Sequence, residues 1–460
     1  MSISLAILFV FVCCYLFWLL LTRKELIFSQ LGVLGVFSLG YYPLPVLFKP
    51  LSSLAGTDDD KVFYALLVHF LFLISILFGA FSSLRVLATI KPLGLGWLDN
   101  LCYRHRFTLA VAAFFLYIAY VMTTPQTSYA TENFEAYFEE KSPVRSILGA
   151  VSEICMGFIC VSYAADSVKG ARLRGPLIFG SMIALIVLLT LPLGQRTVTL
   201  APIMLLFGAM ASHKQSVKAI RILGIGVMVL FTISPFAVYL REARRSQSGE
   251  FLSASEVAGK YQLDANPLMQ SFQSLIDRSD LVYNTVYMKD YIDRTEYVGF
   301  PYYYSVMVSP IPRLIYPTKP YVLSSNGQLD GEISILAWKE MIGGLGSLTA
   351  FGGLTAYREG GWAAVVLDGL ADGAFFVFLA RWLGGGGFVA KVFYSIFFLA
   401  FAVAKAPPCF FEGLAGFLGQ APLIGILLFI SKLPMRGEPR IIVRSSPNVA
   451  SLTISPEKPN

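Results

Sequence analysis

The chain contains apolar runs long enough to cross a lipid bilayer. A helix needs about 20 residues to cross ~30 Å of hydrocarbon, and runs near this length, separated by charged residues, recur along the sequence. The sixth and seventh runs are short, so a tight hairpin that does not fully cross is an alternative for that pair. The pattern predicts an all-α polytopic membrane protein with about eleven transmembrane helices, at residues 3–22, 27–48, 62–84, 107–123, 147–165, 176–193, 198–212, 219–240, 361–380, 388–404 and 409–431.

The composition supports a lipid-facing surface. Hydrophobic residues make up 56% of the chain and charged residues 14%, whereas soluble proteins carry about 25% charged residues. The net charge of +7 is expected from basic cytoplasmic loops and does not indicate a nucleic-acid partner. The six cysteines have no metal-ligand spacing, so neither a metal site nor a disulfide framework is expected. The first run lacks a basic stretch before it, which favours an uncleaved span over a signal peptide.

Basic residues lie in every second loop. Arg23 and Lys24 follow the first run, and Lys214 and Lys218 follow the seventh. Because Lys and Arg are retained on the cytoplasmic side of a membrane, these loops are predicted to be cytoplasmic. The alternate loops are acidic or mixed, as in residues 58–60. The alternation places the protein in the bacterial inner membrane with a periplasmic N-terminus and a cytoplasmic C-terminus.

One loop is far longer than the others. Residues 241–360 carry charges throughout and contain many tyrosines and prolines, and residues 254–297 alternate at roughly helical spacing. We therefore expect a large, partly helical periplasmic loop. The predicted organisation is a bundle at 1–240, the loop at 241–360, spans nine to eleven at 361–431 and a disordered cytoplasmic tail at 432–460.

Two basic clusters lie at the predicted periplasmic boundary. Arg196 lies in a short turn between the sixth and seventh runs. It could have a functional role, or it could simply extend its guanidinium group to water at the membrane surface. The cluster Arg241-Glu242-Ala-Arg244-Arg245 follows the eighth run. The alternative to a functional role for this cluster is a solvated helix end. Arginine gives paired, charge-assisted hydrogen bonds to phosphate, so both clusters suit an oxyanion.

A third polar stretch runs through the large loop. It begins at Arg278-Ser-Asp280, passes Tyr302-Tyr303-Tyr304, and reaches a segment with prolines at 310, 312, 317 and 320 that carries Arg313 and Lys319. The prolines predict a rigid, non-helical segment. The tyrosines suit interfacial packing and also sugar rings. A glycine-rich stretch at 343–353 then leads to Arg358 and Glu359, and glycine permits close approach of the backbone.

These motifs resemble the Wzy-type O-antigen and repeat-unit polysaccharide polymerases. The resemblance rests on Arg278-x-Asp280, on Ile-Pro-Arg313 with Pro-x-Lys319-Pro320, on the glycine-rich stretch and on Gly-x-Arg196. It implies an enzyme, a membrane glycosyltransferase that joins oligosaccharide units carried on undecaprenyl diphosphate. A chain-length regulator and a flippase are the candidate protein partners. The histidine motif typical of ligases is not present in the large loop.

The implied leaving group is a diphosphate, so catalysis needs fixed cations more than a strong acid. We predict catalytic roles for Arg196, Arg313, Lys319 and Glu242, and substrate binding by Arg241, Arg244, Arg245, Arg278, Tyr304 and Arg358. An acceptor hydroxyl needs a base, for which the alternatives are Glu242, Asp330, Glu332, Glu340 and Glu359. No cofactor or metal ion is expected.

Two other functions stay open. A transporter or flippase of lipid-linked oligosaccharide places ionisable residues inside its spans, where Glu153, Asp368 and Asp372 are the acidic candidates. The second is a ligase that moves glycan to another acceptor, which the sequence distinguishes poorly from a polymerase. Charge concentrated on one face and the long loop favour an enzyme.

Overall fold

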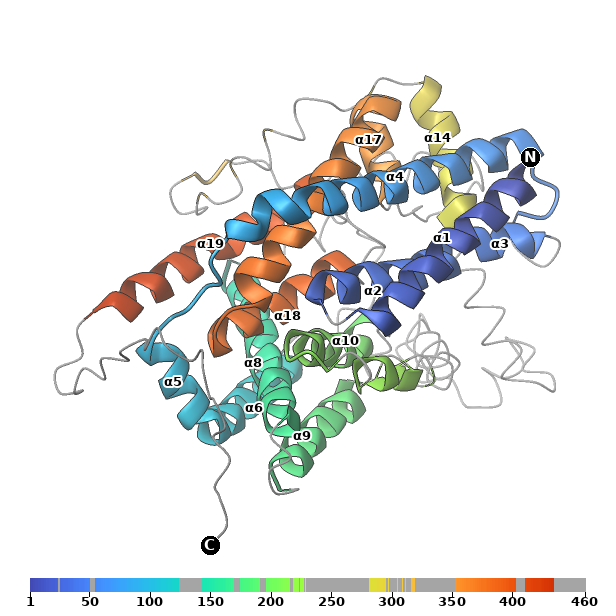
Figure 1. Cartoon of the computed structure of the whole chain (residues 1–460). Helices are drawn as coiled ribbons and strands as arrows, with labels where there is room; N and C mark the ends of the chain where they lie inside the picture. Colours follow the sequence, from blue (N-terminus) through green and yellow to red (C-terminus); the bar gives the residue numbers. More distant parts are fainter. Residues whose placement is uncertain are drawn as a thin grey trace, which may run out of the picture.

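The computed structural model describes residues 1–23, 25–49, 54–123, 143–168, 174–190, 196–215, 218–222, 224–226, 228, 281–294, 297, 304, 308, 311, 316–318, 352–402 and 410–433. Every regular element within these ranges is helical (Figure 1). The elements are α1 (Ser2–Thr22), α2 (Leu26–Tyr41), α3 (Pro43–Leu47), α4 (Asp59–Val86), η2 (Leu87–Thr89), α5 (Trp97–Arg104), α6 (Arg106–Thr123), α8 (Pro143–Val168), α9 (Arg174–Thr190), α10 (Arg196–Ser212), α14 (Leu281–Arg294), α17 (Gly353–Leu379), η4 (Ala380–Gly384), α18 (Phe388–Ala402) and α19 (Phe410–Lys432).

Five of these helical segments are long and apolar enough to cross a membrane: Ser2–Thr22, Leu26–Leu47, Asp59–Thr89, Val151–Val168 and Gly353–Gly384. The all-helical class predicted from the sequence is thus confirmed for the described residues. Five shorter apolar helical stretches coincide with other expected spans. The expected eighth span, 219–240, lies mostly outside the described residues, and the count of eleven spans stays a prediction.

Among the described helices, α4 and α17 make the most extensive contact, and they lie side by side in Figure 1. A Cβ atom at Gly373 would lie 2.0 Å from the carbonyl oxygen of Ile76, and one at Gly79 would lie 2.1 Å from that of Leu370. Hydrocarbon tails are as apolar as a leucine, so helices in a bilayer associate through close packing of small residues. These glycines therefore set how closely α17 approaches α4.

The helix α17 is two helical arms joined by a reversal. Gly360 and Gly361 have non-helical backbone angles, and Gly361 has φ 67° and ψ −151°. Gly353 in the first arm and Gly369 in the second both lie against Phe72 of α4, whereas a straight helix would separate them by about 24 Å along its axis. The first arm of α17 therefore runs along α4 towards the N-terminal end of α4, and the second arm runs back towards the C-terminal end of α4.

The helix α14 crosses α4 in its N-terminal half and packs against it (Figure 1). Asp290 pairs with Lys61 near the start of α4. The hydroxyl of Thr285 lies 2.7 Å from Nε2 of His69, two turns further along, and both side chains are buried. The earlier residues of α14 thus lie deeper in the bundle than its later ones.

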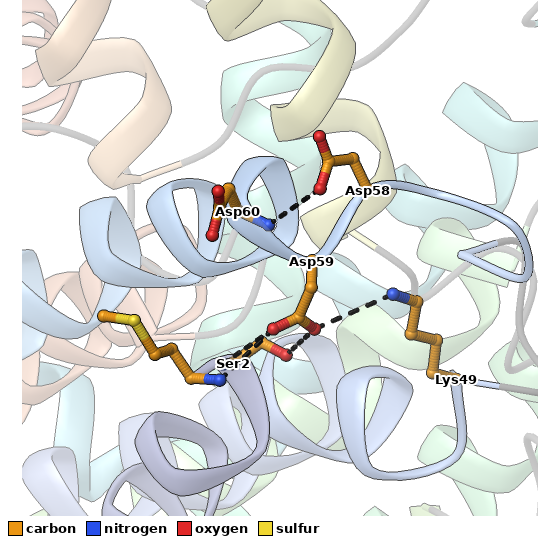
Figure 2. Close-up of polar contacts among 6 residues, drawn as sticks. Ser2, Lys49, Asp58, Asp59 and Asp60 are labelled. Atoms are coloured by element: carbon orange, nitrogen blue, oxygen red, sulfur yellow. Dashed lines mark hydrogen bonds and ion pairs between the residues drawn. The ribbon is translucent and has the colours of Figure 1, made fainter.

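The start of α4 is tied to the first residues of the chain (Figure 2). The Asp59 carboxylate accepts a hydrogen bond from the Ser2 hydroxyl and lies 3.2 Å from the Met1 amine and 3.8 Å from Nζ of Lys49. The Asp58 carboxylate accepts from the Asp60 amide at 3.2 Å and caps the helix. Asp58 and Asp59 therefore have structural contacts at the start of α4.

The opposite end of α4 contacts the basic loops. The Arg381 guanidinium donates to the carbonyl of Leu84 at 3.1 Å and to that of Ala88 at 3.3 Å. At another of these loops, Arg106 lies 2.8 Å from Asp166. Loops that the charge alternation assigns to one side thus contact one another in pairs. The side of the membrane that this end faces stays a prediction.

Candidate active site at the reversal of α17

The reversal of α17 buries two charged residues that precede it. The side chain of Arg358 is fully buried, and Glu359 is only 2% exposed. Consecutive helical residues point about 100° apart, so burial of both requires the first arm to be covered on more than one side. The contacts with α4 and α14 and the return of the second arm provide this cover.

The reversal also joins two acidic side chains. The carboxyl groups of Glu359 and Asp368 interact, although nine residues in a straight helix span about 13.5 Å. Asp368 is 4% exposed, and Asp372, one turn further, is fully buried. All three carboxyl groups are thus held away from water inside the bundle.

A second polar cluster ties α14 to the first arm of α17. The Asp293 carboxylate lies 2.6 Å from Nζ of Lys289 and accepts a hydrogen bond of 2.6 Å from the Tyr357 hydroxyl. The Lys289 ammonium also lies 5.1–5.9 Å from the ring centres of Tyr64, Tyr357 and Trp362, within the range of cation–π attraction. This cluster holds the first arm of α17 against both neighbouring helices.

The structure describes few of the site residues predicted from the sequence. Arg358 is buried at the reversal. Tyr304 is exposed, and its hydroxyl lies 3.2 Å from that of Tyr316, which raises the pKa of Tyr304. The helix α10 begins at Arg196, whose side chain lies outside the described ones. The remaining predicted residues lie outside the described part of the chain: Arg241, Glu242, Arg244, Arg245, Arg278, Arg313 and Lys319.

Other residues of the site were not predicted from the sequence as parts of an active site. From the sequence, Asp368 was considered only as an acidic residue of a possible transporter. No role was predicted for Lys289, Asp293 and Tyr357. A signal was present in the order Arg358-Glu359-Gly-Gly-Trp362, because paired glycines commonly break a helix. Within the described residues, no group of three or more His, Cys, Asp or Glu side chains is placed to hold a metal ion.

A comparison with known families identifies the family of the chain. The family model of O-antigen polysaccharide polymerase Wzy matches residues 1–262, more than half of the 460 residues. The chain belongs to this family. The Wzy resemblance predicted from the sequence is therefore confirmed, and the protein is a multi-pass membrane protein of the polymerase type. No curated protein and no solved structure matches the chain.

The Wzy match covers only part of the candidate site. The matched residues include Arg196, the cluster at 241–245 and the helix α4, which contacts α17. The segment with Arg313 and Lys319, and both arms of α17, come after the matched residues. The assignment of Arg358 to the site therefore rests on its burial at the reversal.

Proposed function

We propose that this chain is a bacterial polysaccharide polymerase. It joins oligosaccharide repeat units carried on undecaprenyl diphosphate, at the periplasmic face of the inner membrane, in O-antigen or exopolysaccharide synthesis. Membership of the Wzy family carries the reaction class. The buried Arg358 beside the reversal of α17 supports the location of the reaction.

The proposed role of Arg358 is to bind the diphosphate of the donor. Its guanidinium stays charged in any environment, and its planar fork matches two phosphate oxygens. The segment with Arg313 and Lys319 connects α14 to α17. Because α14 and the first arm of α17 both pack on the N-terminal half of α4, both ends of this segment are held near Arg358. We therefore expect these three cations to stabilise the leaving diphosphate together.

The proposed reaction uses no metal ion or organic cofactor. Arginine and lysine side chains supply the positive charge that a metal ion supplies in other phosphate-transfer sites. A flippase would deliver the lipid-linked units and a chain-length regulator would limit the product, which makes these two proteins the proposed partners.

A transporter of lipid-linked oligosaccharide is the second candidate, since Asp368 and Asp372 are buried ionisable residues inside a candidate span. The two functions give different products when the gene is deleted. Without a polymerase, single units still reach the periplasm and accumulate as a one-unit product. Without a flippase, no unit reaches the periplasm and no glycan product forms.

The test is complementation of a gene deletion, read as a ladder of glycan lengths on a gel beside an immunoblot of the protein. We expect the deletion to leave a one-unit product and the wild-type gene to restore the ladder. Arg358→Ala, Arg313→Ala and Lys319→Ala should each reduce the ladder roughly tenfold to hundredfold, because each removes a charge-assisted hydrogen bond to phosphate.

The matched control is Arg23→Ala, which removes an exposed arginine at the end of α1 and should leave the ladder intact. Complete loss of glycan in the deletion strain would contradict the polymerase and favour the flippase. A normal ladder from all three variants would remove Arg358, Arg313 and Lys319 from the site.

A further inference from the structure

Aromatic rings from two helices gather around a lysine of a third helix, near the N-terminal end of α4. The ammonium of Lys289, on α14, lies 5.8 Å from the ring centre of Tyr64 on α4. It lies 5.1 Å and 5.9 Å from the ring centres of Tyr357 and Trp362 on α17. Tyr357 also packs edge to face with Tyr297, with their ring centres 6.0 Å apart. These four aromatic residues form one aromatic cluster around Lys289.

Two rings of the aromatic cluster are open at the surface. Tyr64 is 50% exposed and Tyr297 is 48% exposed, whereas Tyr357 is only 3% exposed. Lys289, which is 14% exposed, contacts Tyr64, and Tyr357 contacts Tyr297. Buried or nearly buried groups thus hold both open rings in place. A ligand can reach these rings from the surface without entering the bundle.

Charged side chains show that the aromatic cluster lies outside the hydrocarbon of the membrane. Lys61 and Asp290 form an ion pair with side chains that are 50% and 39% exposed, and Lys61 comes one turn before Tyr64 in α4. Ionisable groups are costly in hydrocarbon, so Tyr64 lies at the level of head groups or water. Aromatic residues at this level commonly anchor a helix in the interface, but anchoring does not require rings from two helices to converge on one ammonium.

Hydrogen-bonding groups with spare capacity border the open rings. The Asp293 carboxylate accepts from Lys289 and from the Tyr357 hydroxyl, both at 2.6 Å, and its side chain is 38% exposed. A carboxylate can accept about four hydrogen bonds, so Asp293 can also accept from a ligand. Open aromatic rings beside carboxylate and ammonium groups match a sugar, which has apolar C–H faces and a rim of hydroxyl groups.

We propose that the open rings of Tyr64 and Tyr297 stack on sugar rings of the lipid-linked oligosaccharide. Asp293 and the pair of Lys61 and Asp290 are the partners of the sugar hydroxyls. The inference rests on the proposed function for the identity of the glycan, and it names the surface that holds this glycan.

The position of the aromatic cluster beside Arg358 supports this inference. Tyr357, the buried ring of the cluster, directly precedes Arg358 in the first arm of α17. Arg358 is the residue proposed for the donor diphosphate. In a lipid-linked unit the first sugar is bonded directly to the diphosphate, so a glycan surface is expected next to the diphosphate site.

The test measures glycan binding apart from polymerisation. The probe is an oligosaccharide of one repeat unit without lipid, prepared by partial acid hydrolysis of the strain's own surface polysaccharide. A saturation-transfer NMR titration gives its Kd for the purified full-length protein in detergent. We expect Tyr64→Ala and Tyr297→Ala each to raise Kd about two- to tenfold, the contribution of one aromatic stacking contact. Tyr64→Phe and Tyr297→Phe keep the ring and should keep most of the affinity.

The matched control is Tyr15→Ala, which removes an equally exposed tyrosine that stacks on Trp18 in α1 and should leave Kd unchanged. Thermal unfolding in detergent checks that each variant is folded. Where an alanine variant does not fold, Tyr64→Leu or Tyr297→Leu carries the test, because leucine keeps apolar bulk without a flat ring.

The outcomes separate this inference from the proposed function. Unchanged Kd in the folded variants of a protein that restores the glycan ladder overturns this inference alone. The absence of glycan binding by the wild-type protein, or an equal loss in Tyr15→Ala, also overturns it. Glycan binding that depends on Tyr64 and Tyr297, in a protein whose gene deletion leaves no glycan product, would support this inference and contradict the polymerase.

Discussion

The hydroxyl of Tyr297 occupies the space that a side chain at Gly361 would need. A Cβ atom at Gly361 would lie 2.9 Å from that hydroxyl oxygen and 3.0 Å from the ring carbon that bears it. The backbone of Gly361, at φ 67° and ψ −151°, is also in a region that only glycine enters readily. Both the conformation and the space therefore require glycine where α17 reverses.

Replacement of Gly361 should disrupt the reversal. We expect Gly361→Ala to destabilise the protein by about 1–3 kcal/mol from backbone strain alone and to reduce polymer formation. Gly360→Ala is the matched control, because its φ of −164° is extended and its Cβ atom would meet only Ala364 at 3.4 Å. Thermal unfolding in detergent would measure the difference, and equal melting temperatures for the two variants would contradict the described reversal.

The close approach of α17 to α4 predicts a cost for adding a methyl group at Gly373. A Cβ atom there would lie 2.0 Å from the carbonyl oxygen of Ile76 and 2.5 Å from the amide nitrogen of Ala80, so the two helices must separate. We expect Gly373→Ala to lose about 1–3 kcal/mol of stability. Gly425→Ala, in α19, has no atom within 4 Å of its added Cβ and should be neutral or slightly stabilising. The same unfolding measurement applies, and a neutral Gly373→Ala would rule out this contact.

The buried hydrogen bond between α4 and α14 predicts the effect of changing Thr285. The Thr285 hydroxyl donates to the carbonyl of Leu281 at 2.6 Å, so it accepts from Nε2–H of His69. Thr285→Val keeps the shape but leaves that N–H buried without its partner, which costs about 1–3 kcal/mol. Thr285→Ser keeps the hydroxyl and should lose much less. If serine and valine lower the melting temperature equally, the hydrogen bond does not hold α14.

The loop charges predict the sidedness of the protein. A topology reporter fused after Arg174 or Lys218 should be active in the form that reports the cytoplasm, because these loops are basic. A reporter inserted near Gly249 should report the periplasm. The opposite result at either position would reverse the orientation and place the proposed site on the wrong side for periplasmic polymerisation.

Replacement of Arg196 by lysine separates phosphate recognition from a simple charge at the interface. An arginine that only extends its head group to water should tolerate Arg196→Lys, which keeps the charge and most of the stem. If Arg196 binds diphosphate through two parallel hydrogen bonds, lysine cannot reproduce the fork, and the glycan ladder should be lost in both Arg196→Lys and Arg196→Ala. Loss in the alanine variant alone would indicate a point charge. A full ladder from both variants, at normal protein level, would contradict a catalytic role for Arg196.

Much of the fold could be predicted from the sequence because apolar runs and loop charges are local signals. The helices α1, α4 and α6 coincide closely with expected spans, and α14 lies within the stretch of helical spacing found in the large loop. The ninth span, expected at 361–380, coincides with the second arm of α17, which follows the break at Gly360 and Gly361. The first arm, which begins at Gly353 and runs along α4, was not predicted.

The sequence by itself determined that the chain is helical and apolar, that it belongs with the polymerases, and that cations and carboxylates gather in one long loop. Only the tertiary structure placed Glu359 against Asp368 and buried Arg358 beside them. The reason is physical: helix formation depends on neighbours within one or two turns. The contact of residues nine positions apart depends instead on where α17 reverses and on how closely glycines let it pack on α4.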